Sequence, residues 1–340
     1  MTLTQTAIFT KRAILGFIIF SILGTVSFIG YKIWYAGYLA SLPPRQDLPD
    51  TKFGILPQPD FPASKVPSSS FSYSLDTATG GLPAFGKLIK VYFMPKASAT
   101  FLAPEKGRAL AEKFKITGSP ETLSETKQRF TQDNRILTVE LDTGNFTYQT
   151  DATPSATTLE DDQRLTQDFK NFLQQIGVLK EGLDSDRIKI KPLKFDGSQF
   201  NVTDSKPEAS GALINLWPGD LDKMPIVTSS FDKPLVQAEI INSARVLENI
   251  RSLKFIFWPV DTSTYATYKL KTPDKAFDEL KSDKGVIIVK PGSSQVSITS
   301  IYLGFYESEN YTPYLQPVFV FEGPGFVAYV SALTDEFLSH

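Results

Sequence analysis

Three carboxylates near the carboxyl end are the residues whose types and spacing most resemble a catalytic site. Glu307, Glu309 and Glu322 stand on and beside predicted strands, so they could approach one another on one sheet. Two carboxyl groups held about 5 to 10 Å apart in a cleft carry out glycoside hydrolysis. Solvated strand ends explain the same residues, because surface carboxylates far outnumber catalytic ones. The sequence therefore favours a structural role for them, with a carboxylate-dependent hydrolase as the alternative.

Two shorter motifs contain reactive or ligating groups in less suitable settings. Ser282 and Lys284 have the atoms of a Ser-Lys dyad, but they stand in a predicted helix end and turn. A lysine base needs burial to lower its pKa, which such a turn does not provide. Asp184 and Asp186 match the first ligand positions of a calcium loop, whose glycine and later glutamate are missing. Both motifs are predicted to be ordinary turns.

The composition excludes several kinds of site. The chain of 340 residues has no cysteine, and its single histidine is His340, the last residue. Thiolate nucleophiles and cysteine metal sites are therefore impossible, and a Ser-His-Asp triad or a histidine zinc site is effectively excluded. The formal charge is -2, and no run of Lys and Arg is interleaved with aromatics, which argues against nucleic acid as a partner. We expect no cofactor, no metal and no catalytic residue, and a protein that is not an enzyme.

An aromatic cluster offers a different kind of site, a surface for a protein partner. Strand alternation places Tyr302 and Tyr306 on one face of their strand, opposite Phe305. With Tyr311 and Tyr314 they form the predicted partner-contact surface. The alternative is that helices and neighbouring strands cover both faces, and it is favoured because aromatics are more often core than contact. Trp258 is likewise predicted to pack at a strand end.

Three Asn-X-Ser/Thr triplets begin at Asn145, Asn201 and Asn310. Each could carry a glycan in a cell that has the machinery. The triplet is frequent by chance, so it does not define the compartment.

The elements that must position these residues begin with an apolar segment. Residues 13–31 contain no charge and follow Lys11 and Arg12. As a helix they would be roughly 28 Å long, close to the thickness of a bilayer core, which predicts a transmembrane helix embedded in lipid. The positive charges before it predict a cytoplasmic amino terminus, residues 1–12, and an extracytoplasmic bulk. A cleaved signal peptide is the main alternative, but its apolar region is usually shorter.

Residues 32–81 are predicted to be a proline-rich stalk or linker. Prolines cluster between Pro43 and Pro67, where periodic hydrophobic residues are few. Prolines hold a chain near the extended polyproline geometry. The alternative is a loop packed along the globular body through its phenylalanines, among them Phe53 and Phe61.

The remaining chain alternates short strands with a few helices, which predicts an α+β ectodomain of antiparallel sheets with packed helices. The polar stretch after Asp196 suggests a boundary between a first lobe, 82–196, and a second lobe, 197–338. Helical spacing after a start at Thr158, with Asp161 three residues later and Gly177 at the end, predicts a soluble helix. A similar X-Pro-acid-Lys start at Pro104 and at Pro273 leaves a diverged duplication open.

The carboxyl end has the pattern of a hairpin. Its two strands are Tyr314-Leu315-Gln316-Pro317-Val318-Phe319-Val320-Phe321-Glu322-Gly323 and Phe326-Val327-Ala328-Tyr329-Val330-Ser331-Ala332-Leu333. Together with the helix at 276–281 and the strand at 301–306, this arrangement resembles PepSY-like domains and the YycH/YycI type of membrane-anchored regulatory protein. The resemblance implies PepSY-like units and an extracytoplasmic, often tethered protein that restrains or modulates partner proteins such as proteases or sensor kinases. It carries over no catalytic residue.

The sequence as a whole predicts a single-pass cell-membrane protein whose bulk lies outside the cytoplasm. Its expected role is non-catalytic, binding or regulating another envelope protein. An envelope glycan-binding protein or hydrolase is the runner-up, and a structural spacer is a third possibility.

Overall fold

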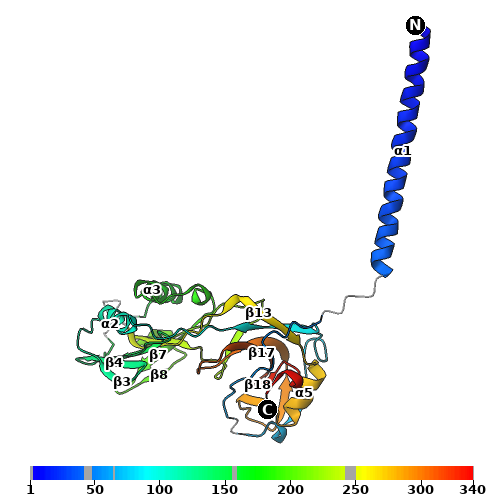
Figure 1. The fold of residues 1–340 in the computed structure, drawn as a ribbon. Coiled ribbons are helices and arrows are strands. Elements are labelled where there is room, and N and C mark those ends of the chain that lie inside the picture. Colours follow the sequence, from blue (N-terminus) through cyan, green and yellow to red (C-terminus); the bar gives the residue numbers. More distant parts are fainter. Residues whose placement is uncertain (1–2, 42–47, 64–65, 155–158, 242–249, 340) are drawn as a thin grey trace. The chain divides into compact units, whose positions relative to one another are not determined.

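The computed structural model describes residues 3–41, 48–63, 66–154, 159–241 and 250–339 of the chain. The chain forms two compact units, Met1–Leu48 and Pro49–His340. Helix α1 (Leu3–Ser41) makes up the described part of the first unit (Figure 1). Every residue of the four hydrophobic clusters belongs to the second unit, called the large unit below. The large unit therefore contains its own core.

Helix α1 confirms the apolar helix that the sequence predicts near the amino end. Its segment Ile14–Tyr38 is long and apolar enough to cross a membrane, so the helix continues past the predicted end at Tyr31. Tyr31 stacks on Tyr35, and Trp34 stacks on Tyr38, with ring centroids 5.9 Å apart in each pair. These rings lie one helical turn apart, as side chains at i and i+4 do.

The large unit is α+β, as predicted. Within the described residues, nine strands form an antiparallel sheet in the order β3-β4-β5-β6-β12-β11-β9-β7-β8. Their bounds are β3 Glu121–Ser124, β4 Lys127–Gln132, β5 Arg135–Glu140, β6 Phe146–Thr150, β7 Ile188–Phe195, β8 Phe200–Val202, β9 Gly211–Leu216, β11 Val236–Ile241 and β12 Ile250–Phe255. Alternation is clearest in β5, where Leu137 and Val139 are buried and their neighbours are half-buried.

A seven-stranded sheet forms the rest of the described β structure, with a small two-stranded sheet beside it. Strands β10-β16-β17-β18-β14 follow one another, and β2 joins β13 to β17. Their bounds are β2 Leu88–Phe93, β10 Ile226–Thr228, β13 Asp261–Lys269, β14 Val286–Val289, β16 Ser300–Glu307, β17 Tyr314–Gly323 and β18 Phe326–Ser331. The two-stranded sheet pairs β1 (Ser72–Leu75) in parallel with β15 (Gln295–Ile298). The predicted carboxyl-terminal hairpin is confirmed as β17 and β18.

Three helices of the large unit pack on these sheets (Figure 1). Helices α2 (Ala103–Lys113) and α3 (Asp162–Gln175) share a hydrophobic cluster with the nine-stranded sheet, and α5 (Pro273–Lys281) shares one with the seven-stranded sheet. Asp161 caps α3 by accepting a hydrogen bond from the Arg164 N–H at 3.0 Å. Thr158, where the sequence places the start, lies outside the described residues. The short 3-10 helices are η1 Ser68–Ser70, η2 Glu181–Leu183, η3 Lys206–Glu208 and η4 Asp335–Phe337.

The predicted division into lobes at residue 197 is wrong. Strands β9, β11 and β12 follow that point, yet they complete the nine-stranded sheet by pairing with β6 and β7. Strand β2 lies before it, yet it pairs with β13 and β17 of the other sheet. The seven-stranded sheet is therefore built from both ends of the large unit. Turn-rich polar composition marks surface loops, which need not be boundaries between sheets.

The predicted stalk over 32–81 is also wrong where the structure describes it. Residues 32–41 continue α1, and residues 49–63 and 66–81 belong to the large unit. Leu56 is fully buried and forms a parallel bridge with Leu338. The Phe61 ring packs against the edge of Tyr306, with centroids 4.9 Å apart. Apolar side chains placed between the prolines hold this segment on the sheet, as the alternative interpretation requires.

Candidate functional site

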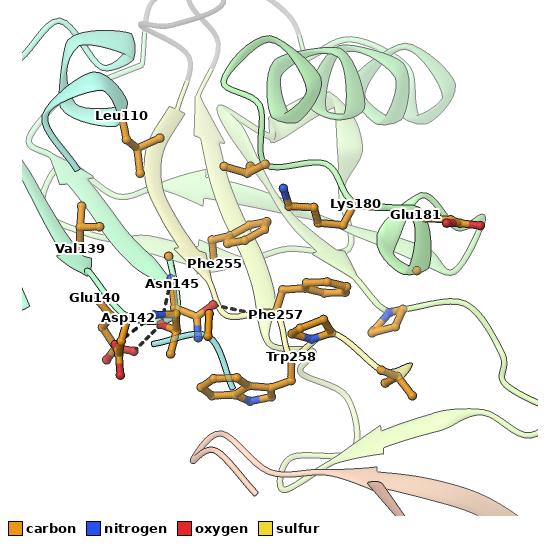
Figure 2. Close-up of a pocket in the computed structure, with 18 of the residues that line it drawn as sticks. Leu110, Val139, Glu140, Asp142, Asn145, Lys180, Glu181, Phe255, Phe257 and Trp258 are labelled. Atoms are coloured by element: carbon orange, nitrogen blue, oxygen red, sulfur yellow. Dashed lines mark hydrogen bonds between the residues drawn. The ribbon is translucent and has the colours of Figure 1, made fainter. Parts of the chain in front are cut away.

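A tight turn between β5 and β6 positions Asn145, the first residue of the site. Gly144 has a φ of +76°, a conformation that favours glycine, and its N–H donates to the carbonyl of Glu140. Strand β6 pairs with β12, so the chain just beyond β12 passes this turn. The Phe257 N–H donates to Asn145 Oδ1 at 3.0 Å, shown by the dashed line in Figure 2. The other end of the amide, Nδ2, is buried without a hydrogen-bond partner in the described part of the chain.

Glu307, at the end of β16, is the second residue of the site. It lies beside Thr228 of β10 and is 2% exposed. Its Oε2 is buried and finds no hydrogen-bond partner among the described residues. Burial disfavours the charged form, which raises the pKa of Glu307 from 4.5 to about 8. At neutral pH the carboxyl is therefore mostly protonated, so it can both donate and accept a hydrogen bond.

Asn145 and Glu307 line one cavity of about 1000 Å³, and Figure 2 shows Asn145 among the residues of its wall. Its walls come from α2, the β5–β6 turn, the chain around η2 and the segment 255–260. Much of the lining is apolar, including Leu110, Val139, Phe255, Phe257 and Trp258. A mostly apolar pocket of this size with a few convergent polar groups is the usual form of a small-molecule site.

Trp258 connects the two polar residues. Its Nε1 donates to the carbonyl of Ser308 at 3.0 Å, directly after Glu307. The preceding residue, Phe257, is the one held by Asn145. Two hydrogen bonds thus tie the nine-stranded sheet, through β12, to the end of β16 at the cavity wall.

The predicted carboxylate trio does not converge. Only Glu307 lines the cavity. Glu309 is exposed and pairs with Lys254 at 2.7 Å, and Glu322 accepts a hydrogen bond from the Tyr302 hydroxyl at 3.2 Å. The hydrolase arrangement proposed from these three residues is therefore not formed.

Ser282 lies in a turn at the end of α5, as predicted, and Asp184 and Asp186 lie in irregular chain after η2. Ser282 Oγ donates to the carbonyl of Asp278, and Lys284 lies 3.9 Å from Asp335, so they form no dyad. Asp184 and Asp186 both pair with the Lys170 ammonium, at 3.1 and 3.7 Å. Across the described ranges, no group of three His, Asp or Glu side chains could hold a metal ion.

Of the four residues in the predicted tyrosine contact surface, Tyr306 is covered by the protein itself. Tyr306 is 4% exposed, lies under Phe61 and donates to the carbonyl of Asp60 at 2.8 Å. Tyr302, Tyr311 and Tyr314 are half-buried, and the Tyr311 hydroxyl donates to the carbonyl of Met94. Segment 49–63, which the sequence assigned to the stalk, supplies the cover over Tyr306. The alternative interpretation, in which these aromatics are core, describes Tyr306 correctly.

Asn145 and Trp258 were assigned other roles from the sequence. Asn145 begins one of the three glycosylation triplets, but in the folded chain its side chain is buried and accepts a hydrogen bond from the Phe257 N–H. Trp258 was expected only to pack at a strand end, and it also faces the cavity. No local pattern predicts their proximity, because the two residues are far apart in the chain and only the pairing of β6 with β12 brings them to the same end of the sheet.

Comparison with known proteins identifies no family. No protein-family model and no curated protein matches the chain. Among solved structures, an uncharacterized protein from Eubacterium rectale has a TM-score of 0.41 and 11% identity to this chain. That match covers 74% of this chain and 86% of the other.

Proposed function

We propose that this chain is a single-pass membrane-anchored protein that binds a small ligand in the cavity of its large unit without converting it. The observation that carries the proposal is that Glu307 and Asn145, each with a buried polar atom that lacks a partner in the described chain, line one mostly apolar cavity. A buried polar group without a partner costs about 1–3 kcal/mol. A ligand that supplies both partners would recover that free energy on binding.

The anchor is the apolar segment Ile14–Tyr38. Lys11 and Arg12 precede it, so we propose that the amino end stays in the cytoplasm and the large unit faces outward. Protease added to sealed cells should then degrade the large unit and leave the helix protected. Protection of the large unit, or a mature chain that begins after Ala40, would contradict the anchored topology. Regulation of a partner envelope protein, which the family resemblance implies, stays a prediction.

The binding proposal is tested by blocking the mouth of the cavity. Ala109 is exposed on α2 and lines the cavity, so Ala109→Trp should fill the mouth without disturbing the core. Glu112→Trp, on the same helix and outside the lining, is the matched control. Each full-length protein is purified from the cells that make it, in lipid nanodiscs, and its small molecules are extracted and compared by mass spectrometry.

A compound retained by the wild type and by Glu112→Trp, and lost from Ala109→Trp, would support the proposal. Equal small-molecule content in all three proteins would overturn it.

A second function, glycan hydrolysis, is favoured by one observation. A buried carboxyl with a pKa near 8 in a cavity has the properties of a general acid. Hydrolysis also needs a second free carboxylate about 5 to 10 Å away. Asp142 lines the cavity but is paired with Lys96 at 3.3 Å. Release of reducing sugar from envelope glycan by the wild type, abolished in Glu307→Gln, would establish this function over pure binding.

A further inference from the structure

The charges around the cavity are not balanced once existing ion pairs are considered. Four lining carboxylates already have a cationic partner within 3.3 Å: Glu140 with Lys127, Asp142 with Lys96, Asp184 with Lys170, and Asp220 with Arg187. Three lining lysines, Lys106, Lys113 and Lys180, have no ion-pair or hydrogen-bond partner for their ammonium groups within the described chain. Glu181 is the one lining carboxylate at the surface that is similarly unpaired there. Three free cations therefore face one free anion.

The positions of these charges separate the rim from the interior. The three lysines are exposed, two on α2 and one just before η2. In Figure 2 the Lys180 side chain runs toward the middle of the labelled residues, whereas the Glu181 carboxylate points away from them. Below this rim the walls are the apolar side chains already described. The cavity thus presents a cationic rim above an apolar body.

The polar residues of the cavity wall set a further requirement. Asn145 Nδ2 can only donate a hydrogen bond, and Glu307 can donate or accept one while it is protonated. A second charge beside Glu307 is disfavoured by the same burial that raises its pKa. A neutral group with its own hydrogen-bonding atoms, such as an amide or a hydroxyl, satisfies both residues.

We propose that the cavity binds an anionic amphiphile: an apolar chain or ring system that carries an amide or hydroxyl group inside the cavity and a carboxylate or phosphate head at the lysine rim. This inference rests on the binding function proposed above and adds the class of ligand. The lysines are expected to bind the head, while Asn145 and Glu307 bind the neutral polar group.

The test uses probes that differ in one feature at a time. N-octanoylglycine has the apolar chain, the amide and the carboxylate. Its methyl ester lacks the charge and octanoic acid lacks the amide, while octylamine reverses the charge of octanoic acid. Binding is measured by equilibrium dialysis of labelled probe against full-length protein in lipid nanodiscs, with the Ala109→Trp protein in identical nanodiscs subtracted to remove lipid partitioning.

We expect N-octanoylglycine to bind about tenfold more tightly than its ester, since three exposed charge contacts each contribute a fraction of a kcal/mol. The triple variant Lys106→Gln, Lys113→Gln, Lys180→Gln should remove that difference. The matched control changes three exposed lysines away from the cavity, Lys189, Lys233 and Lys290, to Gln and should preserve it. A phosphate monoester that carries an octyl chain and an amide is compared with inorganic phosphate alone. This comparison distinguishes an amphiphile from a free anion.

The outcomes separate the ligand class from the binding function. Equal or tighter cavity-dependent binding of the ester or of octylamine would overturn the anionic class and leave the binding function standing. Equal binding of inorganic phosphate would overturn the amphiphile. In a third outcome, no probe binds the wild type better than Ala109→Trp, while extraction still recovers a cavity-dependent compound. That result overturns the proposed ligand class and leaves the binding function standing. Failure of both experiments overturns the binding function as well.

Discussion

Glu307 and Glu279 are both buried carboxyl groups in the large unit, each with one oxygen that lacks a hydrogen-bond partner in the described chain, but only Glu279 has a cation beside it. Glu279, on α5, accepts a hydrogen bond from the buried Lys271 ammonium at 2.5 Å, with Asp335 also 3.3 Å from that ammonium. Glu307 lines a cavity, and its Oε2 lacks a partner in the described part of the chain. A compensated buried charge holds a fold together, whereas an uncompensated carboxyl beside a cavity marks a place for a ligand.

The largest effect should come from Glu307→Gln and should depend on pH. The Glu307 carboxyl ionises near 4.5 in the unfolded chain and near about 8 in the folded protein. Between these values the unfolded state binds fewer protons, so the unfolding free energy of the wild type falls as pH rises and levels off above the folded pKa. Glutamine does not titrate, so the variant should be more stable by on the order of 4 kcal/mol near pH 8 and similar near pH 4.5. Urea unfolding followed by circular dichroism measures this.

The control is Glu309→Gln, two positions along the chain. Glu309 is exposed and pairs with Lys254, so its loss should change stability by less than about 0.5 kcal/mol at any pH in this range. A Glu307→Gln protein whose stability difference from the wild type is the same at both ends of the range would contradict the buried, uncompensated state of Glu307.

Glu279→Gln should have the opposite sign. Removing the carboxylate leaves Lys271 buried with only the partly exposed Asp335 as a counter-charge. We expect a loss of about 3 kcal/mol in unfolding free energy at neutral pH, as for other broken buried pairs. Asp278→Asn on the same helix, whose exposed side chain pairs with Lys281 at 2.7 Å, should cost less than about 0.5 kcal/mol. A neutral or stabilising Glu279→Gln would remove the distinction between the two carboxyls.

The smallest effect tests the cover over Tyr306 and Tyr329, two buried tyrosines outside the cavity lining. Phe61 is half-buried over Tyr306 and Tyr329, with centroids 4.9 and 6.3 Å away. Phe61→Ala should lower the unfolding free energy by about 2 kcal/mol, less than for a fully buried phenylalanine. Ile55→Ala, exposed in the same segment, should change it by less than about 0.5 kcal/mol. If the two variants unfold alike, segment 49–63 does not hold the sheet as described.

Local elements follow from the sequence because their signals are local. The spacing of Leu165, Phe169 and Phe172 predicts a helix, and α3 buries these residues. The alternation in β5 and the hairpin of β17 and β18 are likewise present. Neither the grouping of strands into sheets nor the fate of the proline-rich segment could be predicted in this way. Both depend on contacts between residues far apart in the chain, such as Leu56 with Leu338.

The candidate site was the least predictable part. Glu307 was singled out, but with Glu309 and Glu322, which lie elsewhere. Its actual neighbours across the cavity, Asn145 and Trp258, are separated from it by many residues and carry no shared motif.

The sequence alone determined the apolar amino-terminal helix, the α+β class and the absence of cysteine and internal histidine chemistry, because composition and short-range periodicity are properties of the chain itself. Only the tertiary structure decided which carboxyl is compensated and which is left facing a cavity. Burial and hydrogen-bond partners arise when distant strands pair, and the pairing of β6 with β12 is what sets Asn145 against Phe257 beside the cavity wall.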